Sequence, residues 1–323
     1  MVPPPQPRGP VSDWLMLPAP SRTRTKPPKP VPGTGFGDDV QLGLYIAYES
    51  HYGGAPGGDF DEWDPAVIAM RRSLEREFEA SLERAVTTPH GGDPWLVIPQ
   101  IIAADQSRSV SRYIERHGTL DEMRDVVIHR SAYQLKEADP HSFGIPRLKG
   151  RAKQLFASIQ AGEYGADGHD RRMHAELFAQ TMRSLGLDDR PNAYLDRLPA
   201  SALMISNLIS LFGLNRRWRG ALVGHLTVFE MTSVEPMGRY ARGLDRLGAP
   251  AAARRFYDVH VLADAEHEVI ALEMAGALAD TEPELTGDVL FGACAALAVE
   301  ARFSRDLFER WAGAPAIPHA SVA

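Results

Sequence analysis

The chain has 323 residues, of which 44% are hydrophobic, and it carries a formal net charge of −7. This length suffices for one large domain or two small ones, the acidic balance excludes a broad basic surface for nucleic acid, and no apolar run reaches the roughly 20 residues of a membrane span. The single cysteine, Cys294, excludes an intramolecular disulfide. The single cysteine and the absence of a visible apolar signal-peptide segment favour a cytoplasmic protein.

Residues 1–37 are unusually rich in proline. Eleven of the 25 prolines lie between Pro3 and Pro32, mixed with arginine, lysine, serine and glycine. Such a segment has little to bury, so the composition predicts a disordered or extended tail. A solvated leader and a proline-rich ligand for a partner protein both fit it.

From residue 38 onward the apolar residues recur with helical spacing. The predicted helices cover residues 40–52, 65–86, 95–118, 119–138, 148–164, 171–185, 199–211, 218–231, 239–247, 256–274 and 285–311. Asp64 and Pro65 are typical of a helix N-cap and first position, and Asp167 or Asp170 can cap the helix at 171–185. No strand alternation, hairpin signal or glycine-rich phosphate loop is evident. The sequence therefore predicts an all-α bundle with its chemistry in the interior.

The segment 256–274, FYDVHVLADAEHEVIALEM, carries polar residues inside an apolar stripe. His260, Asp264 and His267 follow one another at i, i+4 and i+7, so they share the face that also carries Phe256 and Met274. Burying two imidazoles and a carboxylate is costly unless they are paired or coordinated. The segment alone leaves two interpretations, a buried His–Asp pair with a half-exposed histidine, or a set of metal ligands.

Other predicted helices place polar residues on apolar faces in the same way. Glu230 is a lone carboxylate in an apolar row, and His174 begins the stripe of its helix. Glu163 and Glu137 stand at predicted helix C-termini, where a carboxylate is unfavourable unless a cation is near. Each residue alone has an ordinary explanation, as a solvated helix-end carboxylate or as a core histidine with a backbone partner.

Together these residues form one candidate ligand set. It comprises Glu137, Glu163, His174, Glu230, His260, Asp264 and His267. An oxygen-rich set with some nitrogen suits iron or manganese better than zinc, and seven ligands are too many for one metal ion. The paired Glu-x-x-His repeats of ferritin-like proteins are absent, so the sequence predicts a two-metal carboxylate site on a different scaffold.

These segments resemble the haem-oxygenase-like di-iron oxidases, also called the iron-containing redox enzyme family. The resemblance is carried by His260-x3-Asp264-x2-His267, by Glu163 and His174 in EYGADGHDRRMHAELF, by Glu230 in FEMTS and by Glu137 in QLKEADPHSF. It extends from about residue 119 to 312. Residues 38–118 look like the N-terminal helical part of other members, with less motif content.

The resemblance implies a haem-oxygenase-like bundle of seven helices with additional N-terminal helices. The domain would span residues 119–323, with segment 38–118 packed on it and the tail 1–37 preceding both. It implies two Fe(II) ions per chain and O2 as co-substrate, and an external electron donor is compatible with it. One iron would draw on Glu137, Glu163 and the histidines, and Glu230 would bridge the irons or complete the set.

What the resemblance implies about function is a choice between two chemistries. Some members N-oxygenate amines or guanidines in natural-product biosynthesis, and others cleave carbon–carbon bonds in fatty acids or amino acids. We expect N-oxygenation of a small amine or amino-acid-like metabolite, with an oxidative lyase or decarboxylase as the alternative. A haem protein would need one axial histidine without the carboxylates, and a thiaminase-like enzyme a nucleophilic cysteine, whereas Cys294 lies among small apolar residues.

Some expectations concern the surroundings of the site. Tyr133, Phe178 and Phe256 are expected to line the pocket. Arg130 is expected either on the surface or one helix face from Glu137, where it could orient a carboxylate next to the metal ligands or the acid group of a substrate. Helices 40–52 and 65–86 carry enough apolar surface for a homodimer contact or for packing within the chain. No nucleic-acid or membrane partner is expected.

Overall fold

The computed structural model describes residues 2–53, 62–166 and 170–313, so the alternative cap Asp167 lies outside the described residues. The described residues form α-helices and short 3-10 helices with no β-strand, which confirms the all-α prediction. None of these helices combines the length and the apolar character that crossing a bilayer requires.

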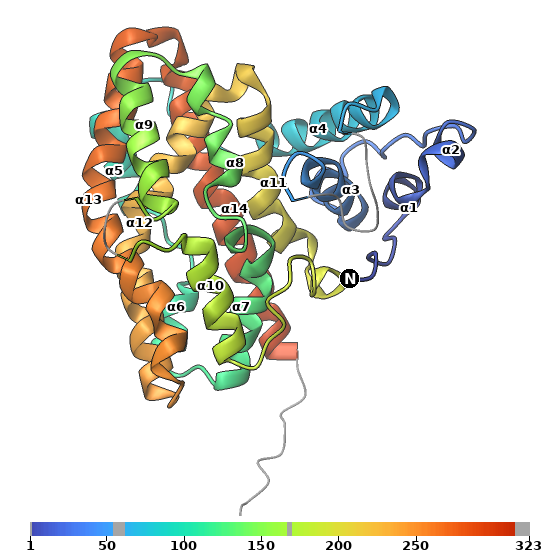
Figure 1. The fold of residues 1–323 in the computed structure, drawn as a ribbon. Helices are drawn as coiled ribbons and strands as arrows, with labels where there is room; N and C mark the ends of the chain where they lie inside the picture. Colours follow the sequence, from blue (N-terminus) through green and yellow to red (C-terminus); the bar gives the residue numbers. More distant parts are fainter. Residues whose placement is uncertain (1, 54–61, 167–169, 314–323) are drawn as a thin grey trace, which may run out of the picture.

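The helices follow one another in a single series along the chain (Figure 1). They are α1 Pro10–Met16, α2 Ala19–Arg22, α3 Asp38–Glu49, α4 Pro65–Ala85, α5 Pro94–Ala104, α6 Val110–Arg116, α7 Leu120–Gln134, α8 Asp139–Ser142, α9 Gly150–Glu163, α10 His174–Ser184, α11 Ala200–Leu214, α12 Arg219–Arg246, α13 Ala251–Thr281 and α14 Thr286–Gly313. The 3-10 turns are η1 Ile145–Arg147, η2 Leu195–Arg197, η3 Arg216–Trp218 and η4 Pro283–Leu285.

The long helix α12 is the centre of the bundle. It packs along α13 on one side and α14 on another, while α9 and α10 cover α13. Gly224 of α12 and Gly292 of α14 permit a close approach, because a Cβ at either would lie about 2 Å or less from a backbone oxygen of the other helix. The helices that carry the candidate ligands therefore surround one interior space.

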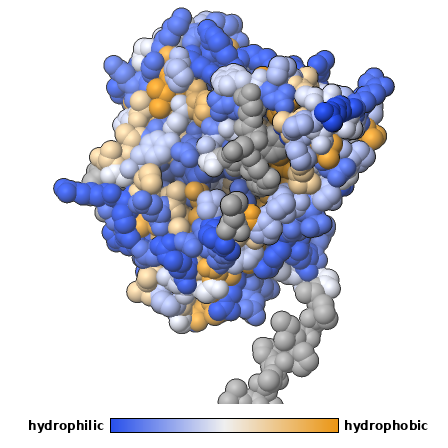
Figure 2. Space-filling view, turned by 45° about the vertical axis from the view of Figure 1, so that its right-hand side comes forward, coloured by the Kyte–Doolittle hydropathy of each residue, from blue (hydrophilic) through white to orange (hydrophobic). Residues whose placement is uncertain are grey.

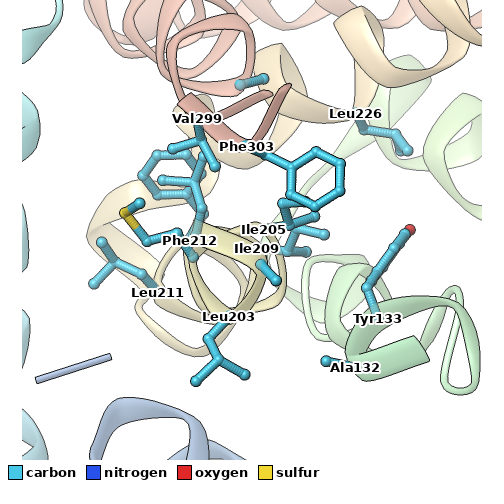
Figure 3. Close-up of a cluster of buried hydrophobic side chains, with 14 of the residues drawn as sticks. Ala132, Tyr133, Leu203, Ile205, Ile209, Leu211, Phe212, Leu226, Val299 and Phe303 are labelled. Atoms are coloured by element: carbon cyan, nitrogen blue, oxygen red, sulfur yellow. The ribbon is translucent and has the colours of Figure 1, made fainter. Parts of the chain in front are cut away.

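Figure 3 shows the hydrophobic cluster around α11, where apolar side chains from four helices meet. Phe212 and Ile209 of α11 face Val299 and Phe303 of α14, and all four are buried. Tyr133 of α7 lies at the edge of this cluster. Tyr133 also lines an interior cavity of the bundle, so this hydrophobic cluster supports part of the cavity wall.

Two predicted helix boundaries are wrong. The segment 95–118 is split into α5 and α6, because Ser109 caps a new helix by accepting the Arg112 backbone N–H. The segments 218–231 and 239–247 are instead parts of the single helix α12, which contains Pro236. A proline removes one helical hydrogen bond. The packing of α12 against α13 and α14 outweighs that loss.

The helix before Glu137 ends earlier than predicted. It begins with the capping box of Thr119 and Glu122 and ends at Gln134, so Glu137 lies in the turn that follows. Ala138 closes this turn with φ +78°, a left-handed conformation that is uncommon for a residue with a side chain. This turn, and not a helix end, directs Glu137 into the bundle.

Residues 2–37 differ from the predicted tail. They contain α1 and α2, and Val11, Trp14 and Leu15 of α1 are buried against α3. The carboxylate of Asp39 accepts hydrogen bonds from the backbone of Val11 and Ser12. The proline content conceals an apolar triplet at i, i+3 and i+4, and Pro10 stands at a helical position that favours proline.

Helices α1 to α4 form the N-terminal group, which lies beside α11 (Figure 1). Most of α3 is buried among α1, α4 and α11, so its apolar surface is used within the chain. In contrast, α5 and α6 of the predicted segment 38–118 pack on the bundle itself. Figure 2 shows one face of the molecule, where hydrophilic residues predominate. A homodimer stays a prediction.

A buried ion pair joins the N-terminal group to the turn that carries Glu137. Lys136 donates to Glu49 at the end of α3, and its ammonium lies 4.4 Å from the centre of the Tyr45 ring. Burial lowers the pKa of Lys136 and raises the pKa of Glu49, despite their mutual attraction. The Lys136 ammonium and the Glu49 carboxylate therefore stay charged in the interior only because each lies beside the other.

We expect the substitution Glu49→Leu to lower the free energy of unfolding by about 3 kcal/mol, because it leaves the Lys136 ammonium buried without its partner. The double substitution Glu49→Leu with Lys136→Met should recover part of that loss. Urea unfolding followed by far-UV circular dichroism measures both. The exposed pair Arg151–Glu273 is the control, since Glu273→Leu should change little. Strict additivity of the single substitutions would contradict the coupling.

Candidate metal centre

The structure brings all seven predicted ligand residues together in the bundle interior. Group A consists of Glu137, Glu163, His174 and His260, and group B consists of Glu163, Glu230, Asp264 and His267. Within each group, one ligand atom per residue lies within 4.8 Å of the others, and every residue is buried. The two groups share Glu163, whereas the resemblance implied Glu230 as the residue that bridges or completes the set.

The ligand residues come from four helices and one turn. Helix α13 supplies His260, Asp264 and His267 from successive turns of one face, as their spacing predicts. Glu163 is the last residue of α9 and His174 is the first of α10. Glu230 belongs to the middle of α12 and Glu137 to the turn after α7. The residues therefore converge from segments far apart in the sequence.

The distances within the groups are those of ligands around a common ion. The Nδ1 of His174 lies 2.7 Å from Oε2 of Glu163, and Nδ1 of His267 lies 3.5 Å from Oε1 of the same carboxylate. His260 Nε2 lies 3.5 Å from Oε2 of Glu137. Two atoms bound at right angles to one metal at about 2.1 Å are about 3 Å apart. Glu163 can thus give one oxygen to each group.

Four ligand atoms have no hydrogen-bond partner among the described residues. They are Glu137 Oε2, His174 Nδ1, His260 Nε2 and His267 Nδ1. The close approach of His174 to Glu163 therefore lacks the alignment of a hydrogen bond. Buried polar atoms without partners are costly. A metal ion at each group would satisfy them, so the residues present fit the metal that the donor set suggests.

The orientation of two ligands is fixed by their neighbours. Nδ1 of His260 lies 2.8 Å from the Phe256 carbonyl, so this nitrogen donates and leaves the Nε2 lone pair for group A. The hydroxyl of Ser233 donates to Oδ2 of Asp264. The other carboxylate oxygen, Oδ1, lies 3.9 Å from Nδ1 of His267. The hydrogen bonds of His260 to the Phe256 carbonyl and of Ser233 to Asp264 hold these two side chains in position before a metal binds.

The electrostatics of the site reflect four carboxylates in a small volume. Burial lowers the pKa of His260 and of His267, but the facing carboxylates outweigh it and raise these pKa values to about 10 and about 11. Burial and the neighbouring Asp264 and Glu163 raise the pKa of Glu230 to about 7. Protons on the imidazoles thus compensate the carboxylates in the metal-free protein, and metal binding must displace them.

Groups A and B border a cavity of about 300 Å³. Glu137, Glu163, Glu230, His260 and Asp264 all contribute to its wall. Its other walls come mostly from α7, α12, α13 and α14, and residues 105–111 around the start of α6 line the rest. A small molecule in this cavity would lie directly against the ligand carboxylates.

Comparison with known proteins agrees with this geometry. The model of the iron-containing redox enzyme family matches residues 124–301, which is more than half of the chain. The chain belongs to the iron-containing redox enzyme family. It is also 26% identical over 139 residues to nitrosourea synthase from Streptomyces achromogenes subsp. streptozoticus. That alignment covers 43% of this chain and 29% of the relative, so the chain spans under a third of that protein.

Membership of the iron-containing redox enzyme family agrees with the all-α, haem-oxygenase-like fold of the described residues. The family match begins within α7 and includes all seven candidate ligands. The N-terminal group lies outside the match.

The expectations for the pocket wall are confirmed for one residue of three. Tyr133 lines the cavity, and burial together with Glu137 raises its pKa well above the usual range, so it keeps its proton. Phe178 and Phe256 do not line it. They pack against each other behind His260, whose ring centre lies 4.2 Å from that of Phe256. Helical periodicity predicts that Phe178 and Phe256 lie inside the bundle, but it does not indicate whether they face the cavity.

Arg130 pairs with a carboxylate, as one of the two expectations for it had it, whereas Asp170 does not take its predicted role. Arg130 is half-buried in the cavity wall and pairs with Glu300 of α14, not with Glu137. Asp170 does not cap α10, whose N-cap is Met173. It pairs instead with Arg172 and Arg255, and the Arg172 hydrogen bond lowers the pKa of Asp170 to about 2.

Other polar residues line the same cavity without having been predicted to do so. Gln134, Gln160 and His141 are buried there, and Nε2 of His141 lies 3.2 Å from Nδ1 of His225. Each glutamine stands three residues before a candidate glutamate, Gln134 before Glu137 and Gln160 before Glu163, and this spacing is the signal that could have found the two glutamines. Cys294 does not line the cavity, so the described site lacks a thiol nucleophile.

We expect substitutions in the two groups to separate the two metal positions. Because Glu163 belongs to both groups, Glu163→Ala should abolish stable binding at both. His174→Ala should affect only group A, and His267→Ala only group B, so each should retain one iron per chain. Metal analysis after anaerobic loading with Fe(II) and desalting measures the stoichiometry.

His141→Phe is the matched control for these variants. His141 is a buried histidine in the same cavity wall but belongs to neither group, so the variant should keep the iron content of the unmodified protein. Far-UV circular dichroism checks that all variants remain helical. Equal iron content in the His174→Ala, His267→Ala and unmodified proteins would contradict the ligand assignment.

Proposed function

We propose that this protein is a non-haem di-iron, O2-dependent oxygenase that N-oxygenates a small amine or amino-acid-like metabolite in natural-product biosynthesis. The observation that carries the proposal is the pair of overlapping ligand groups, which share Glu163 and border one cavity. In this proposal two Fe(II) ions occupy groups A and B. When bound, the iron supplies the electrons that reduce O2.

Charge balance supports two ions and not one. The two groups contain four carboxylates, from Glu137, Glu163, Glu230 and Asp264, and three imidazoles that bind metals in the neutral form. Four negative charges are compensated by two divalent cations. A single ion would leave two carboxylates uncompensated in a buried site, which is unfavourable. The mixed carboxylate and imidazole ligands suit iron.

The protein residues have limited tasks in such a reaction. Ser233 and the Phe256 carbonyl hold two ligand side chains in place. Tyr133 stays protonated in the cavity wall, where it can donate a hydrogen bond to a bound molecule. The aromatic and aliphatic wall limits access of water to the reacting atoms. These roles concern orientation and exclusion, and the redox chemistry belongs to the metal.

The choice of N-oxygenation rests on the relative named nitrosourea synthase. A nitrosourea contains a nitrogen in an oxidised state, so the name describes a protein that makes an N-oxidised product. The similarity covers only 29% of that protein. It supports N-oxygenation over carbon–carbon cleavage for this chain without naming the substrate.

The proposal predicts that the full chain binds two Fe(II) ions under anaerobic conditions and then consumes O2 faster than the same amount of free iron. An oxygen electrode measures the consumption. Mass spectrometry of a panel of amines incubated with the loaded protein should find products heavier by one oxygen atom. His267→Ala provides the control, since it should retain one iron and lose the O2 consumption.

Two outcomes would contradict the proposal in different ways. A protein that binds no more than one iron would refute the di-iron claim. A protein that binds two irons and consumes O2, but gives products that have lost carbon from the substrate, would refute N-oxygenation and leave the metal centre intact.

A further inference from the structure

Away from groups A and B, the cavity wall contains a pair of oppositely charged side chains. Nη1 and Nη2 of Arg130 on α7 donate to the two carboxylate oxygens of Glu300 on α14, each at 2.7 Å. The Arg130 guanidinium lies over the Phe303 ring, 4.4 Å from its centre. Both charged side chains line the cavity. The cavity therefore presents a fixed cation beside a fixed anion.

This pair has unused hydrogen-bonding capacity. A guanidinium has five N–H donors and a carboxylate has about four lone-pair sites. The pair uses two of each, and the other three donors of Arg130 have no partner in the described ranges of the chain. The planar guanidinium matches a carboxylate, and the Glu300 carboxylate is suited to an ammonium group.

A second observation indicates that the cavity binds a polar molecule. Gln134 lies one helical turn from Arg130 toward Glu137, is 7% exposed and lines the cavity. Gln160 lies in the same wall, and its buried Nε2 has no hydrogen-bond partner among the described residues, whereas its Oε1 accepts from Ser142. A buried amide without a partner is unfavourable, so the contents of the cavity must provide one.

The pair and groups A and B occupy different parts of the cavity wall. Arg130 lies on α7, roughly 6 Å along the helix before its last residue Gln134, and Glu137 lies in the turn that follows. The rest of the wall is largely apolar and aromatic, and it includes Tyr133, Leu226, Phe229, Met237 and Tyr257. A molecule that fills the cavity would have a charged head, an apolar middle and a reacting end at the metal.

We propose that Arg130 and Glu300 recognise the zwitterionic head group of an α-amino acid. The carboxylate of the ligand accepts from the free guanidinium donors, and its ammonium group donates to Glu300. A simple carboxylate would meet the repulsion of Glu300, and a simple amine that of Arg130. Only a head group with both charges satisfies both. The inference that the far end of the ligand reacts at the metal rests on the proposed function. Recognition of the head group does not require the metal.

Three probes with the same alkyl chain test this inference. L-Norleucine has the full head group, pentylamine lacks its carboxylate, and hexanoate lacks its ammonium group. Calorimetric titration of the full chain, loaded anaerobically with Fe(II), measures their affinities. We expect norleucine to bind roughly tenfold to a hundredfold more tightly than either analogue, the range for charge-assisted hydrogen bonds.

Variants of the pair assign the preference to it. Arg130→Met should remove the advantage of norleucine over pentylamine, and Glu300→Gln should remove its advantage over hexanoate. Arg151→Met is the matched control, because Arg151 forms a similar ion pair with Glu273 on the outside of the protein. The two variants test the pair independently, so a failure of one to fold leaves the other informative.

Several outcomes would overturn the inference. Equal affinities of norleucine and its two analogues would contradict it, and so would the absence of saturable norleucine binding. Variants that lose thermal stability but keep the preference would make the pair a structural contact between α7 and α14 only. Repeating the titrations after chelation separates this inference from the proposed function, since the head-group preference should persist without iron while the iron content reports on the metal centre alone.

Discussion

The central constraint on this structure is the burial of four carboxylates and three imidazoles in one helical bundle. Isolated charges of this kind are too costly for a protein interior. Either protons or metal ions must compensate them. The raised pKa values of His260 and His267 show the first solution in the metal-free protein. The unpartnered ligand atoms show that protons do not satisfy the site completely.

The arrangement of the helices follows from this constraint. Helix α13 contributes three candidate ligands, and the helices that contribute the other candidates, α9, α10 and α12, all pack against it. Most ligands lie on regular helices, where backbone geometry fixes the direction of the side chain. Glu137 is the exception, because a turn with a left-handed residue positions it. Its neighbour Lys136 is held by Glu49, so the N-terminal group helps to fix one corner of the site.

The sequence predicted that the seven candidate residues lie together better than it predicted their surroundings. His260, Asp264 and His267 could be singled out because helical periodicity makes a polar residue on an apolar stripe visible. Glu137 was included through its motif, although its helix was predicted too long. Trp14 and its neighbours were missed because proline-rich composition concealed a short amphipathic helix. Composition averages over a segment, whereas burial depends on a few side chains and on what packs against them.

The cavity wall was the hardest feature to predict, and the reason is geometric. Periodicity distinguishes the inside of a helix from its outside, but the inside of a bundle includes both packed core and cavity. Phe256 and Tyr133 have similar patterns around them, yet one packs behind a ligand and the other faces the cavity. The pairing of Arg130 with Glu300 joins residues 170 positions apart. Such a pair can be identified only when the helices are placed relative to one another. If groups A and B hold the metal, as proposed, the Arg130–Glu300 pair in the same cavity wall would select which molecules can extend to it.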